Sequence, residues 1–257
     1  DDKIVERNAA GEEVRPLDIS ITKNVLGLFI NSAVLLVIMM SCVRWYKKHP
    51  LEDGAPKGGV GMIEATVLSI YNDVIKGCIG ENYRRYAPYL LTAFFFVLVN
   101  NLMGLIPIFP GGANVTGNIA ITLVLALCTF VLTNVYGTKV YWKEIFWPDV
   151  PTWLKAPIPM MPLIEFFGIF TKPFALMIRL FANIMAGHAA VLSLVAIIFI
   201  TVKSGPVING SMTVVSVAFS IFMDALEILV AFIQAYVFTM LSAVFIGLSQ
   251  VKEHAEK

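Results

Sequence analysis

Five charged side chains interrupt segments of this sequence that are otherwise almost wholly apolar: Glu165, Lys172, Arg179, Asp224 and Glu227. His188 adds a sixth titratable group to the same segments. A charge at the centre of a bilayer costs about 2.5–3.5 kcal/mol on insertion scales, so such side chains usually mark a pathway for ions or protons. The chemistry that these residues indicate is therefore proton transfer within a membrane.

Arg179 lies on a polar stripe. At about 100° per residue, Glu165, Lys172 and Asn183 fall within about 40° of Arg179 on a helix. The same face carries small side chains, which allow a second helix to approach closely in a membrane: Ala175, Ala182, Ala186, Ala190 and Ser193. Two interpretations fit this face. It is a docking face for a helix of a partner protein, or it is structural, with Arg179 paired to a carboxylate of this chain.

The charge of Arg179 constrains the mechanism. A guanidinium is effectively never deprotonated, so Arg179 cannot itself relay a proton. A fixed positive charge also opposes a continuous cation pore. A proton path on this chain is therefore interrupted at Arg179, and a mobile carboxylate from another protein is needed to carry protons past the interruption.

A second polar stripe lies in the last apolar segment. Its side chains fall within about 40° of one line on a helix, and they are Thr213, Ser216, Ser220, Glu227 and Gln234. Asp224 faces partly away from this line. The stripe forms either a water or proton path, which its carboxylate favours, or ordinary bonds between helices worth about 0.6 kcal/mol each. His188 faces away from Arg179, and its partnership with Glu227 is either a proton relay or a structural pair.

The elements that must position these residues are membrane-spanning helices. Of the 257 residues, 58% are apolar and 14% charged, with a mean hydropathy of +0.77. Soluble domains are about 45–50% apolar and about 25% charged. About 20 apolar residues span a bilayer as a helix. The segments that qualify are 25–43, 88–107, 118–136, 163–202 and 208–250.

The last two segments are about twice the usual length of a span. A helix of about forty residues is about 60 Å long, so each must tilt steeply, bend or leave the membrane. Pro173 offers a bend in the first of them, and Lys203–Val207 forms a short turn between them. We expect an antiparallel pair of long, tilted helices; splitting each into two ordinary spans is the competing interpretation. The predicted fold is an all-α integral membrane protein with five crossings.

Lysine and arginine in short loops mark the cytoplasmic side of a membrane. Here they follow the first and third segments: Arg44, Lys47, Lys48, Lys57, Lys139, Lys143 and Lys155. This predicts an extracytoplasmic N-terminal tail at 1–24, a single membrane domain at 25–257 and a cytoplasmic C-terminus. Residues 61–79 alternate apolar and polar side chains at helical spacing. They form an amphipathic helix that lies on the inner membrane surface or docks on the other spans.

The rest of the composition argues against other classes of function. A net charge of +1 gives no basis for nucleic-acid binding. Three histidines far apart in the sequence give no metal-ligand spacing, and three cysteines make no disulfide framework. The chain lacks a His-Glu-x-x-His motif and a serine–histidine arrangement, so we expect no hydrolase, and no cofactor.

Three stretches resemble one known family. Residues 172–188 (KPFALMIRLFANIMAGH) and 226–240 (LEILVAFIQAYVFTM) closely resemble the membrane-embedded a subunit of rotary F-type ATP synthases. Residues 101–107 (NLMGLIP) are similar to a motif in the second span of that family. With five crossings, the resemblance covers nearly everything after residue 20.

The resemblance implies roles for several residues of the two apolar segments. Arg179 faces the carboxylates of a c-ring and separates two offset half-channels. Glu227 and His188 line the outer half-channel, in the order familiar from mitochondrial members, and Glu165 belongs to the inner one. The family positions beside Arg179 are Lys172, Asn183 and Gln234, whereas Ser216, Ser220 and Asp224 are further candidates. Gly104 stands where some bacterial members carry an aspartate.

The resemblance also implies partners and a location. The partners are the c-ring subunits, the b subunits of the peripheral stalk and the rest of the complex, and this chain transports protons without being catalytic. Its acidic N-terminal tail favours a bacterial inner membrane, with the mitochondrial inner membrane as the alternative. The other function considered is a self-contained proton-coupled secondary transporter. Such transporters often show two related halves, which this sequence lacks.

Overall fold

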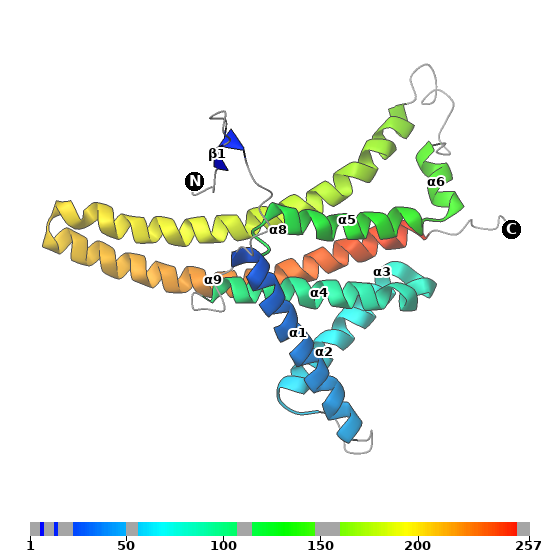
Figure 1. Ribbon diagram of the computed structural model, residues 1–257, viewed down its shortest axis with the longest axis horizontal. Helices are drawn as coiled ribbons and strands as arrows, with labels where there is room; N and C mark the ends of the chain where they lie inside the picture. The colour runs from blue at the N-terminus through cyan, green and yellow to red at the C-terminus, as the bar shows by residue number, and fades with distance from the viewer. Residues whose placement is uncertain are drawn as a thin grey trace.

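The computed structural model describes residues 6–7, 13–14, 23–49, 56–106, 115–146 and 160–250. These residues are almost entirely helical, which confirms the predicted all-α class; the exceptions in regular structure are two antiparallel two-residue strands, β1 (Glu6–Arg7) and β2 (Glu13–Val14). Most of the predicted N-terminal tail, the loop at 107–114 and Lys155 lie outside the described residues. The helices (Figure 1) are α1 (Lys23–Lys48), α2 (Gly59–Ser69), η2 (Ile70–Lys76), α3 (Gly77–Ile79), η3 (Gly80–Asn82), α4 (Tyr83–Leu105), α5 (Ile119–Val135), α6 (Lys139–Phe146), α8 (Met160–Thr201), η4 (Val202–Ser204) and α9 (Pro206–Ser249).

Helices α8 and α9 form one long antiparallel hairpin (Figure 1). They contain 42 and 44 residues and neither is divided, so the interpretation as four ordinary spans is wrong. The turn uses Gly205 at a φ of 102°, a backbone conformation that glycine adopts without a steric penalty. Figure 1 shows the first part of α8 bending away from α9, and Pro173 is the proline inside this helix.

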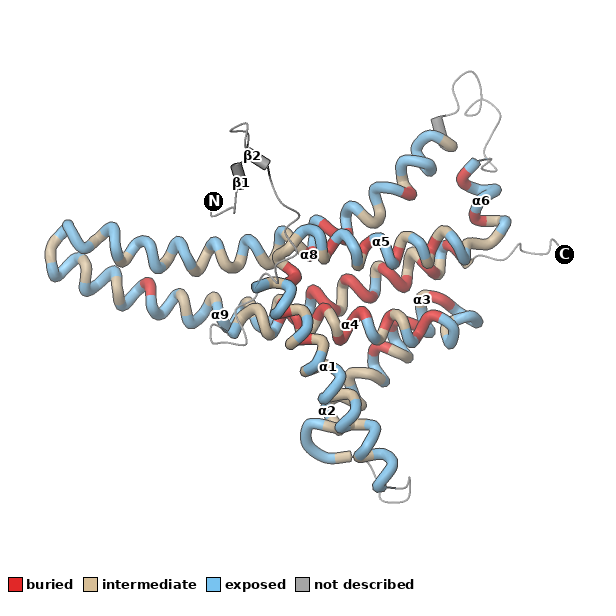
Figure 2. Tube along the Cα trace, viewed as in Figure 1, coloured by how far each residue is buried: buried red, intermediate tan, exposed pale blue. Residues whose placement is uncertain are grey.

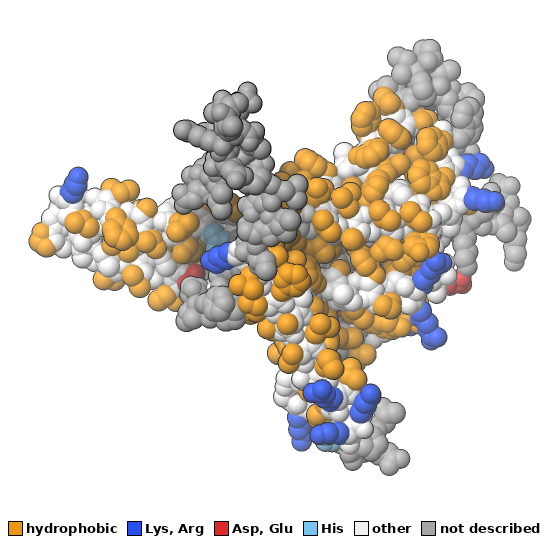
Figure 3. Space-filling model, in the orientation of Figure 1, with side chains coloured by type: hydrophobic (Ala, Val, Ile, Leu, Met, Phe, Trp, Pro, Cys, Tyr) orange, Lys and Arg blue, Asp and Glu red, His pale blue; other side chains and the backbone are white. Residues whose placement is uncertain are grey.

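The surface and the helix lengths suit a membrane. Four described helical stretches are long and apolar enough to cross one, and α5 with α6 makes a fifth if the two are counted together across a 99° bend. Apolar side chains cover the visible face in Figure 3, while lysines and arginines gather at the free end of α1 and beside α6. An exposed apolar surface of this extent is covered by lipid or by other membrane proteins.

The core lies where α4, α5, α8 and α9 meet. Helix α4 packs on α9 and α5 packs on α8. Figure 2 shows the buried residues concentrated there, whereas the half of the hairpin nearer the turn alternates exposed and intermediate residues, with Ser216 buried. Helix α5 contributes a stripe of small and hydroxyl side chains, which allows close helix packing: Thr122, Ala126, Thr129 and Thr133.

The amphipathic segment docks on the core through its apolar side. Ile70, Val74 and Ile75 are buried against α4 and α9, while Asp73 on the opposite side is exposed. Met62 departs from the predicted pattern, because 71% of it is exposed. Ile63 and Val67 in the same helix follow the pattern and pack against the core, so the departure is confined to Met62.

Helix α9 approaches α3 closely at Gly247, where a Cβ atom would collide with the Cys78 carbonyl. We expect Gly247→Ala to force the two helices apart and to destabilise the protein by about 1–3 kcal/mol. The measurement is the thermal denaturation midpoint of the purified complex. Gly210→Ala is the matched control, because Gly210 lies in the same helix with open space around it; equal midpoints for the two variants would contradict this packing.

Candidate functional site

Arg179 has no partner among the residues that the structure describes. Its side chain is exposed on α8, and it forms no salt bridge or side-chain hydrogen bond with any residue that the structure describes. The alternative of a structural pair with a carboxylate of this chain therefore has no support among those residues. A charged group on an apolar helix normally pairs with something, so the group that balances Arg179 must come from outside the described chain.

A cavity between α4, α8 and α9 brings three of the predicted residues together. Asn183, His188 and Glu227 line it, although no hydrogen bond joins His188 directly to Glu227. The volume of the cavity that the centre of a water molecule can occupy is about 30 Å³. One water needs about 10–15 Å³ on this measure, so the cavity is large enough to hold water. The remaining lining residues are Asn101, Gly104, Leu105, Ile184, Gly187, Val230 and Ala231.

Two oxygen atoms of this cavity have no donor. Glu227 Oε1 and Asn101 Oδ1 are buried without a hydrogen-bond partner in the described part of the chain. Gly187 lies directly against the Glu227 carboxylate, and a Cβ atom at Gly187 would overlap it. A buried acceptor without a donor costs about 1–3 kcal/mol, so these atoms are suited to bind water or a proton. The missing side chain of Gly187 provides the space for the carboxylate.

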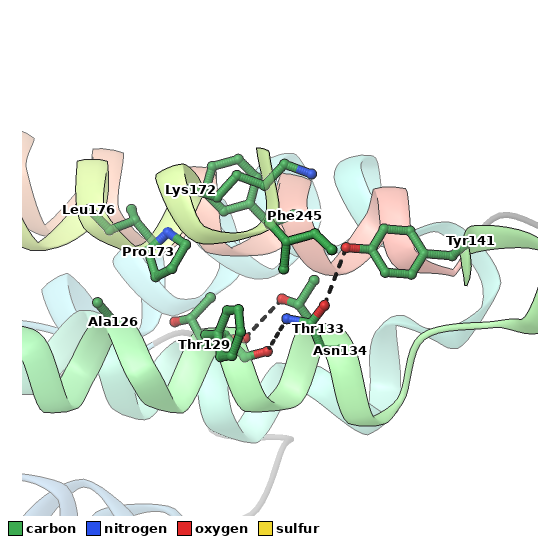
Figure 4. Close-up of a pocket in the computed structure, with 11 residues that line it drawn as sticks. Ala126, Thr129, Thr133, Asn134, Tyr141, Lys172, Pro173, Leu176 and Phe245 are labelled. Atoms are coloured by element: carbon green, nitrogen blue, oxygen red, sulfur yellow. Dashed lines mark hydrogen bonds between the residues drawn. The ribbon is translucent and has the colours of Figure 1, made fainter. Parts of the chain in front are cut away.

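A second, smaller cavity surrounds Lys172 between α5, α6, α8 and α9 (Figure 4). Lys172 is half-buried, and its ammonium lies 5.8 Å from the centroid of the Phe245 ring, which is within the range of a cation–π contact. In Figure 4 the Tyr141 hydroxyl reaches Asn134, at a distance of 3.5 Å between Oη and Oδ1. The remaining lining residues are Ala126, Thr129, Phe130, Thr133, Ile169, Pro173 and Leu176.

The bend between α5 and α6 places Tyr141 in this cavity. Gly137 lies in the bend, and a Cβ atom there would approach to 2.9 Å from Tyr141 Cδ1. From the cavity, a set of hydroxyl groups leads into the core: Thr129 Oγ1 lies 2.8 Å from Tyr89 Oη and 3.2 Å from Ser242 Oγ. These contacts connect α4, α5 and α9 through polar atoms.

The two cavities lie on opposite sides of Arg179 along α8. At about 1.5 Å per residue, Lys172 precedes Arg179 by about 10 Å and His188 follows it by about 14 Å. These two cavities share no lining residue, and the fixed positive charge of Arg179 lies between their positions on α8.

The other predicted residues are more dispersed. Gln234 and Ser216 are buried and Ser220 is half-buried on α9. Glu165 and Asp224 are exposed and line neither cavity. Two features were not predicted from the sequence: the polar stripe of α5 and the contact of Gly187 with Glu227. Hydroxyl and small residues recur at helical spacing in 118–136, and this recurrence indicates the stripe of α5.

Comparison with known proteins agrees with this geometry. Residues 26–247 match the family model described as ATP synthase A chain. "ATP synthase subunit a" of Chlorobium phaeobacteroides is 49% identical over 93% of this chain and 68% of its own length. The proteins of the same name from Chloroherpeton thalassium and Myxococcus xanthus are 44% and 39% identical, over 94% and 93% of this chain and 70% and 75% of their own lengths. The chain therefore belongs to the ATP synthase subunit a family, the non-catalytic, membrane-embedded and proton-translocating component of that complex.

Proposed function

We propose that this chain forms two offset half-channels for protons against a rotating c-ring, and that Arg179 separates them and attracts the carboxylate of the ring. The observation that carries this proposal is an exposed guanidinium that has no partner among the described residues and lies between two separate cavities along α8. Because Arg179 cannot release its proton, protons pass it only on a carboxylate that moves. The ring supplies these carboxylates in succession.

The cavity of Glu227 is the outer half-channel in this proposal. Glu227 exchanges protons with the ring carboxylate, and His188 and Asn183 keep the cavity polar around it. An imidazole has one nitrogen that can donate a proton and one that can accept it, so His188 is chemically able to pass a proton on. Gln234 continues the polar face of α9 toward the core, and Ser216 and Ser220 continue it toward the turn.

The cavity of Lys172 belongs to the inner half-channel. Support comes from its place on the opposite side of Arg179 and from its polar lining, which includes Tyr141 and Asn134. Glu165 lies nearer the start of α8 and is exposed, so it is available to take protons onward to the inner aqueous phase. The ammonium of Lys172 favours release, because a nearby positive charge stabilises an ionised carboxylate. Asp224 has no assigned step.

Partners and location follow from the same proposal. The partners are the c-ring subunits, the peripheral-stalk b subunits and the remainder of the complex. The location is a bacterial inner membrane, with the N-terminus outside and the C-terminus in the cytoplasm; the mitochondrial inner membrane is the alternative. The lysines and arginine at the end of α1 and on α6 support this orientation. Each proton that crosses is worth about 2.3 kcal/mol per 100 mV.

Arg179→Lys tests the role of the guanidinium. We expect a marked loss of ATP-driven proton pumping, since a compact ammonium keeps the charge but lacks the planar fork that binds a carboxylate in two places. Quenching of a pH-sensitive dye in inverted membrane vesicles measures the pumping. Lys203→Arg, at the exposed turn of the hairpin, is the control that should pump normally. Undiminished pumping by Arg179→Lys would refute the assignment.

Gly187→Ala tests the position of Glu227. The added methyl group displaces the carboxylate, and a misplacement of about 1 Å can cost about 10²-fold in rate. We expect proton pumping to fall sharply while the amount of assembled complex stays normal, because the far end of a side chain can move aside. Gly168→Ala, with open space around it in the same helix, should pump as the parent does; equal rates for both variants would show that Glu227 need not stay in place.

The alternative of a self-contained transporter makes a different prediction. We expect the purified chain alone to give no proton flux in liposomes, and the complex isolated from membranes to contain a ring of small hairpin subunits that each carry one carboxylate within the membrane. Dye-reported flux and mass spectrometry of the isolated complex measure these. Sustained proton flux through the chain alone would favour the transporter.

A further inference from the structure

Three neighbouring helices each carry a buried oxygen without a hydrogen-bond partner. In the described part of the chain, the side-chain oxygens of this kind are Asn31 Oδ1, Asn101 Oδ1, Thr116 Oγ1 and Glu227 Oε1. The asparagines and the glutamate lie on α1, α4 and α9, and α4 packs against both of the others. Because nine-tenths or more of buried polar groups have partners, three such acceptors in one region indicate that donors from outside the described residues, such as water, bind there.

Asn31 holds the contact between α1 and α4. It is 1% exposed, and its Nδ2 donates to Asn100 Oδ1 at 2.9 Å. The Nδ2 of Asn100 in turn donates to the Phe96 carbonyl at 2.8 Å. Within α1, the buried residues are Gly27 and Asn31. The one polar side chain that α1 buries therefore keeps a free acceptor, Asn31 Oδ1, in an otherwise apolar contact.

Asn100 and Asn101 connect this contact with the Glu227 cavity. Consecutive residues on an α-helix point about 100° apart, so Asn100 reaches α1 while Asn101 reaches α9. There Asn101 Nδ2 donates to the Ala231 carbonyl at 3.3 Å, one turn beyond Glu227, and Asn101 lines the cavity itself. Side-chain amides thus occupy both sides of α4 between α1 and the carboxylate.

The depth of these residues suits access from outside. At about 1.5 Å per residue, Asn31 lies about 12 Å from the first residue of α1, and Asn100 lies about 8 Å from the last residue of α4. With the N-terminus outside, both ends are the outer ends of their helices. A bilayer core is about 30 Å thick, so the pair lies in its outer half.

We propose that the Asn31–Asn100 pair extends the water path of the Glu227 cavity toward the outer surface along α1, with Asn31 Oδ1 accepting a hydrogen bond from a water on that path. This inference rests on the proposed function of the cavity. An amide neither ionises nor takes up a proton near neutral pH, so Asn31 is a positioning residue that holds water in place. Proton entry then depends on α1 as well as on α8 and α9.

Thiol accessibility tests the path directly. Asn31→Cys, Asn101→Cys and Leu35→Cys are made separately in the whole complex, in a chain whose Cys42, Cys78 and Cys128 are replaced by serine. Silver ion is the probe, because it is small, travels through water and reacts with thiols. Leu35 lies one turn deeper on the same face of α1 and packs against the apolar core, so it is the matched control.

We expect silver ion to block ATP-driven proton pumping in Asn31→Cys and Asn101→Cys but not in Leu35→Cys. A block in Asn101→Cys without one in Asn31→Cys overturns the extension along α1 and leaves the proposed function intact. No block at either asparagine position overturns the Glu227 cavity as a water path, and the extension with it. A block at all three positions overturns the assignment to the amide pair.

Substitution of Asn31 gives a second, independent measurement. Asn31→Leu keeps the approximate volume but removes the acceptor, and we expect a several-fold drop in pumping per assembled complex. Asn31→Ser restores an acceptor oxygen and should recover most of the rate, although it fills less space. Recovery by serine distinguishes water binding from packing; equal loss in the leucine and serine variants, at equal amounts of complex, overturns the proposal.

Discussion

The structure depends on one electrostatic constraint, which is a guanidinium that faces out of its own chain within an apolar surface. Arg179 has no counter-ion among the residues that the structure describes, and a lone charge at membrane depth is costly. A chain that balanced Arg179 internally would be more stable by itself. In the proposed mechanism a neighbouring protein supplies the negative charge, and the guanidinium attracts a moving carboxylate.

Packing determines where the two polar compartments lie. Helices α8 and α9 run antiparallel, so residues distant in sequence, such as His188 and Glu227, meet at one cavity. Small residues make the close approaches possible. The missing side chain of Gly187 leaves space for the Glu227 carboxylate against α8, and the small and hydroxyl residues of α5 allow hydroxyl contacts with α4 and α9. Helices α8 and α9 therefore contribute both to the apolar core and to the positions within it where polar groups are held.

Much of this arrangement could be predicted from the sequence. Hydropathy and length predict the helices, and the hairpin follows because 203–207 is too short for any other connection. Helical spacing places Arg179 and His188 on opposite sides of α8. The spacing could not reveal which glycine contacts Glu227 or that Asn31 meets Asn100, because these depend on the relative rotation and depth of separate helices. The π-helical turn η2 could not be predicted either, since such a turn does not show in an apolar pattern.

The free half of the α8–α9 hairpin has a consequence for biogenesis. Between Leu192 and Val215 its large apolar side chains are widely exposed, and α4 and α5 do not reach this far along it in Figure 1. Helix association inside a bilayer relies on packing and hydrogen bonds, and the described helices other than α8 and α9 give this half little of either. A newly inserted copy outside the proposed complex therefore has only lipid against this half of the hairpin.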